Sequence, residues 1–417
     1  MNNKTFFNTR LISAAVAGLF CVALPATAQE ASKPKGVPMG PMVAYPEVDL
    51  TFKSTNNIYT QPAGPNRKSA NITVLAPKVK LEAKDGPHTF DATYRVEAGR
   101  YSISSANYTD QALSANANWV FTGRSGLKLG AEYLLGHDDQ GSDPAAAGAL
   151  KNVPDKYHQT TVNLLGGYGA EGAQGRIEVE AGSINKRYDN FRFTAAGLPD
   201  NTKRDRDDRK LGATFYWRVA PKTQLLFQAV RTRFDYAQAS SAAASWTELD
   251  SVEKKYNFGV TWDAAAKTRG VFKVGHTKKD FDNGTLRDFS GSGWEAQIQW
   301  KPLTYSTVDF STGKSPGEST IGNASLDTRY SLSWNHAWTG LVSTTASYNY
   351  TGTDYQYNAG VATQQKDKLH AYGLKLNYQW MPTVKVGVAY DNTDKQSTSA
   401  TSVYKKDVWS LFLNAAI

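Results

Sequence analysis

Cysteine is almost missing from this sequence, and the single one lies in a segment that we expect to be removed. Of 417 residues only Cys21 is a cysteine. It follows a basic start and lies in an apolar stretch that ends at the small residues Ala26 and Ala28, which is the pattern of a secretory signal peptide. We predict a signal peptide over residues 1–28, with cleavage after Ala28. The mature chain would then form no disulfide, thiolate metal site or cysteine nucleophile.

Long apolar runs are missing as well. After the signal peptide, no segment has the roughly 20 consecutive apolar residues that a membrane-spanning helix needs. A transmembrane β-barrel needs none, because only alternate residues of each strand face lipid. The formal net charge is +9, yet the cations alternate with apolar residues and do not gather along a helix. We therefore expect no nucleic-acid partner, and a polar lumen with charged loops that face lipopolysaccharide.

What the chain does contain is strand-like alternation, seen most clearly in residues 293–310. From Trp294 to Trp300 every second residue is large or apolar, and the residues between are polar. A period of two gives a β-strand one apolar and one polar face. Pro302 and Leu303 interrupt the run, since proline removes a backbone donor, and the alternation then resumes. We predict a hairpin with its turn at Pro302-Leu303.

A tryptophan shortly before a tight turn recurs along the chain. Aromatic residues collected at one level of a ring of hairpins form a girdle at the membrane–water interface. We expect these tryptophans to point outward at one level near the periplasmic edge. The predicted girdle consists of Trp119, Trp217, Trp262, Trp300, Trp338 and Trp380.

The tight turns give the number of strands. Eight turns at intervals of roughly 37 to 50 residues join sixteen strands, and one more strand at each end gives about eighteen. We predict an all-β fold, a transmembrane antiparallel up-and-down β-barrel over residues 47–417, with short periplasmic turns and longer extracellular loops. A propeller has a similar period, but the segments are long for its blades. The proline-rich residues 29–46 are predicted to be a flexible periplasmic leader. The predicted turns lie near Asp85-Gly86, Gly123-Gly126, Glu171-Gly175, Pro221-Lys222, Ala264-Lys267, Pro302-Leu303, Gly340-Leu341 and Pro382-Thr383.

Charged residues fall almost entirely on the polar face of these segments. A lysine or arginine facing lipid at mid-depth would cost about 2–4 kcal/mol, so the charged face should line the lumen. The last strand, which ends at Ile417, resembles the signal read by the barrel-assembly machinery. The candidate lumen-lining residues are Arg95, Glu97, Lys128, Glu132, Arg176, Glu178, Arg218, Lys255, Lys273, Glu295, Arg329, Lys375 and Lys385.

No catalytic or metal-binding cluster is visible, and we expect no metal and no cofactor. The six histidines are scattered, without the spacing of a zinc site. Outer-membrane phospholipases use a histidine, an asparagine and a serine on the barrel wall, which makes Asn335-His336 a candidate pair. Because His336 lies two residues before Trp338 at the periplasmic rim, a hydrogen bond at the rim is the favoured role for it. The charged run over residues 201–210 is predicted to be a solvated loop, with a saccharide or lipopolysaccharide contact as the alternative.

Short stretches with a recognisable sequence follow one another along the chain. They are residues 94–101, 169–176, 205–223, 271–275 with 279–281, and 305–309. This ordered series resembles the β-barrel porin family encoded in exopolysaccharide and capsule operons, and the resemblance covers the chain from about residue 51 to its end. It implies an outer-membrane barrel that gives secreted polysaccharide a path across the outer membrane, beside a periplasmic polysaccharide export protein. The alternatives are a general diffusion porin for small solutes, a structural or adhesive barrel, and a lipid-acting enzyme.

Overall fold

The computed structural model describes residues 35–140, 153–170, 172–192, 201–237, 249–264, 267–319, 323–357 and 364–417. In this part of the chain eighteen strands, β2 to β19, pair antiparallel with their neighbours in chain order, and β19 pairs with β2 to close a barrel. The strands are β1 (Val37–Met39), β2 (Met42–Thr55), β3 (Ala70–Asp85), β4 (His88–Tyr101), β5 (Tyr108–Thr122), β6 (Ser125–Asp138), β7 (Asp155–Tyr168), β8 (Gly175–Tyr188), β9 (Arg206–Ala220), β10 (Thr223–Tyr236), β11 (Ser251–Ala264), β12 (Thr268–Phe281), β13 (Phe289–Leu303), β14 (Ser306–Gly317), β15 (Ala324–Ala337), β16 (Val342–Gln356), β17 (Lys366–Met381), β18 (Val384–Ser397) and β19 (Tyr404–Ala416).

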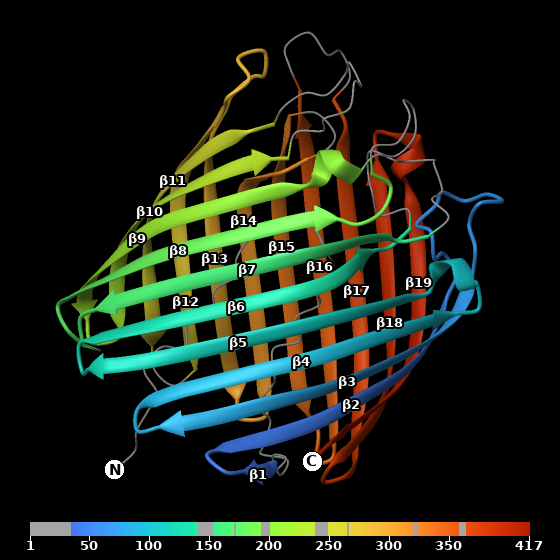
Figure 1. Cartoon of the computed structure of the whole chain (residues 1–417), viewed down its shortest axis with the longest axis horizontal. Coiled ribbons are helices and arrows are strands. Elements are labelled where there is room, and N and C mark those ends of the chain that lie inside the picture. The colour runs from blue at the N-terminus through green and yellow to red at the C-terminus, as the bar shows by residue number, and fades with distance from the viewer. Residues whose placement is uncertain are drawn as a thin grey trace.

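This architecture confirms the predicted barrel of about eighteen strands. The strands of the front wall, β2 to β9, cross those of the rear wall at a steep angle, as the tilt of strands in a closed barrel requires (Figure 1). The eight short turns lie at one end and the longer connections at the other. Three short 3-10 helices, Ser104–Ala106, Asn201–Arg204 and Ala400–Ser402, belong to those longer connections. No helix in the described ranges is long and apolar enough to cross a membrane.

The barrel begins earlier than residue 47, where we predicted its start. Strand β2 begins at Met42, and β1 folds back on it with Val37 opposite Ala44, so part of the segment predicted as a flexible leader is paired. Pro46 lies within β2 although it has no N–H group. Its carbonyl accepts a hydrogen bond from the amide of Ile417, so the missing donor faces the end of the chain. A proline is tolerated at such a position because no ladder partner is lost.

The turn between β13 and β14 also differs from its predicted place. Strand β13 continues to Leu303, and the turn is formed by Thr304 and Tyr305. The pairing of β13 with β14 shifts between Trp300 and Leu303, so Pro302 lies in an irregular part of the ladder. A bulge leaves backbone groups unpaired and can therefore hold a residue without an N–H group. The predicted turn at Pro302-Leu303 therefore lies two residues before the observed one, and Pro302 marks an irregularity of the strand pairing.

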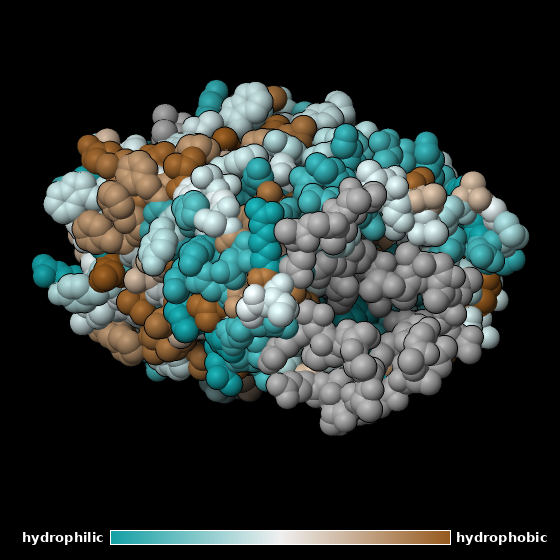
Figure 2. Space-filling model, turned by 90° about the horizontal axis from the view of Figure 1, so that it is seen from above, coloured by the Kyte–Doolittle hydropathy of each residue, from teal (hydrophilic) through white to brown (hydrophobic). Residues whose placement is uncertain are grey.

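The outer face of the barrel is apolar at mid-height. Residues directly opposite one another on antiparallel strands share a face, and rows of apolar side chains follow, such as Phe215, Phe227 and Phe258 on β9, β10 and β11. All three are exposed on a surface that a membrane would cover. Apolar side chains gather on the outer flank at the left of Figure 2, where the short turns of β5 to β9 lie in Figure 1.

The assignment of faces can be tested with one pair of neighbours on β15. Leu332 points outward and is 44% exposed, whereas Ser333 lies on the inner face. We expect Leu332→Arg to reduce the unfolding free energy in a lipid bilayer by about 2–4 kcal/mol. Ser333→Arg places the same charge in the lumen and should cost less than about 1 kcal/mol. Urea unfolding in vesicles measures both, and equal losses would contradict the register.

Candidate functional site: the barrel lumen

The structure places all thirteen candidate lumen residues on the inner face. They alternate with apolar residues of the outer face, as Lys128 does with Leu127 and Leu129, or Lys375 with the exposed Leu374 and Leu376. The alternation of a β-strand therefore brings together side chains that are far apart in the sequence. That these residues line a conduction path remains a proposal.

Most of these charged side chains have an oppositely charged neighbour on the lumen wall. Arg176 lies 3.4 Å from Glu178 and over the ring of Tyr216 at 4.4 Å. Lys273 and Glu295, on neighbouring strands, are 2.8 Å apart. Arg95 pairs with Glu97, and Arg329 with Asp327, in each case across one intervening residue of the same strand. Pairing at this range keeps the electric field local, so the lumen wall is polar without a single dominant charge.

Several inner-face charges at mid-height remain accessible to solvent. The side chains of Arg95 and Arg329 are 46% and 45% exposed, and Glu132 is exposed as well. These residues lie near the middle of β4, β15 and β6. Burial of an ionised side chain is costly unless it is fully paired, and these three side chains stay open to solvent. The middle of the lumen is therefore accessible to water.

The wall formed by β15 and β16 is lined by hydroxyl and amide groups. Ser331 donates a hydrogen bond to Asn349 at 2.7 Å, and Thr345 donates one to Asn335 at the same distance. Ser333 and Ser347 lie opposite each other between these pairs. Such groups both donate and accept hydrogen bonds. Between the ion pair of Arg329 with Asp327 and the short turn, this wall is thus neutral and polar.

A buried ion pair lies near the extracellular end of the lumen. Lys279, on the inner face of β12, is 0% exposed, and its ammonium group contacts the carboxylate of Glu318 from the segment after β14. The Nζ atom also lies 4.2 Å from the centre of the Phe234 ring. Burial raises the pKa of the Glu318 carboxyl, but the positive charges of Lys279 and Arg206 outweigh it, and the pKa is lowered. Glu318 therefore stays ionised and joins its segment to the barrel wall.

A second cluster at the same end corrects the interpretation of residues 201–210. We predicted a solvated loop, but Asn201 and Asp205 are 1% and 0% exposed, and β9 begins at Arg206. Arg204 reaches the inner face, where it pairs with Asp138 and, at 3.0 Å, with Asp155. Only the three-dimensional pairing of β6, β7 and β8 brings these acids to Arg204, so the sequence alone gave no sign of them.

The six girdle tryptophans lie at the end of the barrel that carries the short turns. Each lies in the last residues of an odd-numbered strand or directly after it. Trp217, Trp300, Trp338 and Trp380 are 44–58% exposed on the outer face. Trp119 and Trp262 are partly exposed and share the outward alternation of their strands. Their role at a lipid interface is proposed from this position.

Asn335 and His336, the candidate catalytic pair, lie on opposite faces of the barrel wall. His336 points outward between Trp334 and Trp338, with ring centres 5.3 and 4.3 Å away. Among the residues that the structure describes, its Nδ1 atom has no hydrogen-bond partner, so the predicted rim hydrogen bond is not made through that atom. Asn335 lies on the inner face, bonded to Thr345. Adjacent residues on opposite faces cannot act on one substrate. In the described ranges no group of histidine, cysteine and acidic residues could hold a metal ion.

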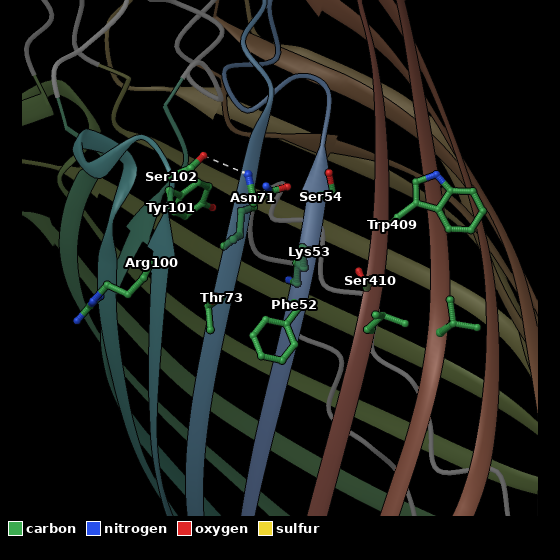
Figure 3. A pocket seen from close by; sticks show the side chains of 13 residues that line it. Phe52, Lys53, Ser54, Asn71, Thr73, Arg100, Tyr101, Ser102, Trp409 and Ser410 are labelled. Atoms are coloured by element: carbon green, nitrogen blue, oxygen red, sulfur yellow. Dashed lines mark hydrogen bonds between the residues drawn. The ribbon is translucent and has the colours of Figure 1, made fainter.

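A groove of about 600 Å³ lies where β2 closes the barrel against β19, near the extracellular end (Figure 3). Phe52 and Trp409 line it and are 52% and 58% exposed on the outer face. Arg100, also in its lining, donates hydrogen bonds to the carbonyl of Tyr108 at 2.6 Å and to Thr109 at 3.2 Å. The guanidinium thus supplies hydrogen-bond donors to acceptors at the point where β4 and β5 separate. This groove belongs to the outer surface and not to the lumen.

Comparisons with solved structures give distant similarities. OpdQ of Pseudomonas aeruginosa matches with a TM-score of 0.48 and 11% identity, covering 91% of this chain and 99% of that one. OccAB3 of Acinetobacter baumannii has a TM-score of 0.46 and 10% identity, with 90% and 99% covered. The siderophore receptor PirA of Acinetobacter baumannii has a TM-score of 0.44 and 8% identity, with 89% and 80% covered. No curated protein matches the chain.

The family comparison covers nearly the whole chain. The family model described as Putative beta-barrel porin 2 matches residues 30–416. Together with a closed barrel whose outer face is apolar, this match indicates a protein of the bacterial outer membrane. The chain belongs to the family described as Putative beta-barrel porin 2.

Proposed function

We propose that the protein is a passive channel for small hydrophilic solutes across the outer membrane. The observation that carries the proposal is the exposure of Arg95, Glu132 and Arg329 in the middle of the lumen. Barrels of 16 to 18 strands are wide enough to enclose an aqueous channel. Water around charged side chains at mid-height is what a continuous aqueous path requires.

The local pairing of charges supports broad solute tolerance. Cations outnumber carboxylates among the thirteen candidate residues, but Arg176, Lys273 and Arg329 each lie beside an acid. Conduction requires binding that is weak enough to release the solute. We propose a weak preference for anions and little discrimination among neutral solutes. No catalytic step is part of this function.

Liposome swelling tests this function. Vesicles that contain the folded barrel should swell in isotonic solutions of small sugars, with rates that fall as the sugar becomes larger. Vesicles with heat-denatured barrel provide the control. No swelling with the smallest sugar, at a protein density that gives folded and inserted barrels, would contradict a passive channel.

The sequence resemblance implied an export path for exopolysaccharide, and a deletion strain distinguishes this function from a passive channel. The description of the family names a porin and no polysaccharide. We expect a deletion strain to take up small solutes more slowly while its surface polysaccharide stays unchanged. Loss of surface polysaccharide with unchanged solute uptake would favour the export path, together with the periplasmic export partner that it requires.

A further inference from the structure

The outer surface carries a row of three cations that oppose one another on neighbouring strands. Arg231 on β10 lies opposite Lys254 on β11, and Lys254 lies opposite Lys278 on β12. Directly opposed residues in an antiparallel sheet have their Cβ atoms about 4.5–5.5 Å apart, and like charges at this distance destabilise the sheet. Such a row needs a compensating partner.

Acidic residues of the described chain compensate this row only in part. Lys254 and Lys278 share one carboxylate, that of Asp280, at 3.7 and 2.7 Å. Arg231 is exposed and makes no ion pair or hydrogen bond within the described ranges. The side chains of Lys254 and Lys278 are 45% and 54% exposed, which leaves donors free for an external anion. The row therefore has a local excess of positive charge.

The height of the row matches the edge of the hydrocarbon layer. Lys254 lies eight residues before the girdle residue Trp262 on the same strand, which is about 27 Å along the strand. With a tilt of about 40° this is about 20 Å along the membrane normal, and the apolar band of such barrels is about 25 Å tall. The backbone of the row thus lies about 5 Å below the upper edge of that band, from where long lysine and arginine side chains reach the head groups of the outer leaflet.

The residues on either side of the row agree with this placement. Toward the membrane centre follow Tyr256, which is 59% exposed, and then Phe227 and Phe258, whose ring centres are 5.0 Å apart. Toward the extracellular rim follow acids, of which Asp235 and Asp282 pair with Arg233. Charge is thus ordered along the membrane normal, with an apolar surface, then cations, then acids. A lipid with a negatively charged head group has the complementary order of acyl chains and anion.

We propose that Arg231, Lys254 and Lys278 form a binding site for the phosphorylated head group of an outer-leaflet lipid. The head-group phosphate lies between the three cations, and the acyl chains lie along Tyr256, Phe227 and Phe258. Hydrogen bonds between cations and phosphate are charge-assisted and strong. The site is on the outer wall and does not depend on the proposed channel function.

The matched variants change the same amount of charge. The test variant carries Arg231→Gln, Lys254→Gln and Lys278→Gln. The control variant carries Gln at three outward cations on β17 and β19 that do not form a row, Lys366, Lys368 and Lys405. Lys366 and Lys405 lie beside Asp354 and Asp394 at 3.3 and 3.1 Å.

Native mass spectrometry in a mild detergent then measures the binding of bisphosphorylated lipid A. A cation near an anionic lipid surface contributes about a factor of five in affinity. We expect binding to the test variant to weaken on the order of 100-fold, and the control variant to bind as wild type does. Lipid A without phosphate should bind weakly to all three proteins. Equal binding by test and control variants, both shown to be folded by their heat-dependent gel mobility, would overturn the proposal. So would wild-type binding that does not depend on the phosphates.

Discussion

Replacing Arg95, Lys255, Lys273 and Lys375 together by glutamine should abolish the anion preference of the channel. All four lie on the inner face of the barrel, and their removal leaves the carboxylates of Glu97 and Glu295 without their cations. The sign of the charge along the lumen wall then reverses locally. In planar bilayers under a salt gradient, we expect the permeability ratio of chloride to potassium to fall to about unity.

An equal number of cations on the outer face provides the control for this prediction. Lys254, Lys278, Lys366 and Lys368 are exposed on the outer side, and their replacement by glutamine should leave the reversal potential unchanged. Heat-dependent gel mobility checks that the lumen variant folds, because Lys273 is only 14% exposed and its replacement removes the partner of Glu295. A lumen variant with wild-type selectivity would mean that these four side chains do not line the conduction path.

A large loss of stability is expected from Lys279→Met. The substitution leaves the carboxylate of Glu318 buried without its nearest cation. Removal of one partner of a buried ion pair costs about 3–5 kcal/mol. We expect a loss near 3 kcal/mol, at the low end of that range, because Arg206 still attracts Glu318. Urea unfolding in detergent measures the loss.

Two further variants show whether burial is the cause. Lys278→Met changes the neighbouring lysine, which points outward and is 54% exposed, and should cost about 0.5 kcal/mol or less. The double variant Lys279→Met with Glu318→Gln removes both charges and should recover part of the loss. If Lys279→Met costs no more than Lys278→Met, the pair does not stabilise the extracellular end of the barrel.

The alternation of residues was sufficient to predict the barrel and its two faces. A strand of such a barrel has one face toward water and one toward lipid, so the polarity of a side chain indicates its face. Lys128 can therefore be assigned to the inner face and Leu129 to the outer face without knowledge of the neighbouring strands. The two shifted boundaries involve prolines. Pro46 ends the predicted leader and Pro302 begins the predicted turn, but each proline lies in a strand, at a position that needs no N–H donor.

The clusters at the extracellular end could not be predicted in the same way. They join side chains far apart in the sequence, such as Arg204 with Asp138 or Lys279 with Glu318. Their contacts depend on the conformation of the connections between strands, which no period in the sequence specifies. The opposed row of Arg231, Lys254 and Lys278 likewise depends on the register of three strands.

The water-filled lumen can be tested most directly by labelling single cysteines. Cys21 is the only cysteine of the chain, so Cys21→Ser gives a background without thiols. Into it we would introduce Glu132→Cys or Arg329→Cys on the inner face, and Leu332→Cys on the outer face. In intact cells, a membrane-impermeant maleimide should label the two inner positions rapidly and leave the lipid-facing position unlabelled. Inner positions that stay unreactive in the folded barrel would contradict an aqueous path through the lumen.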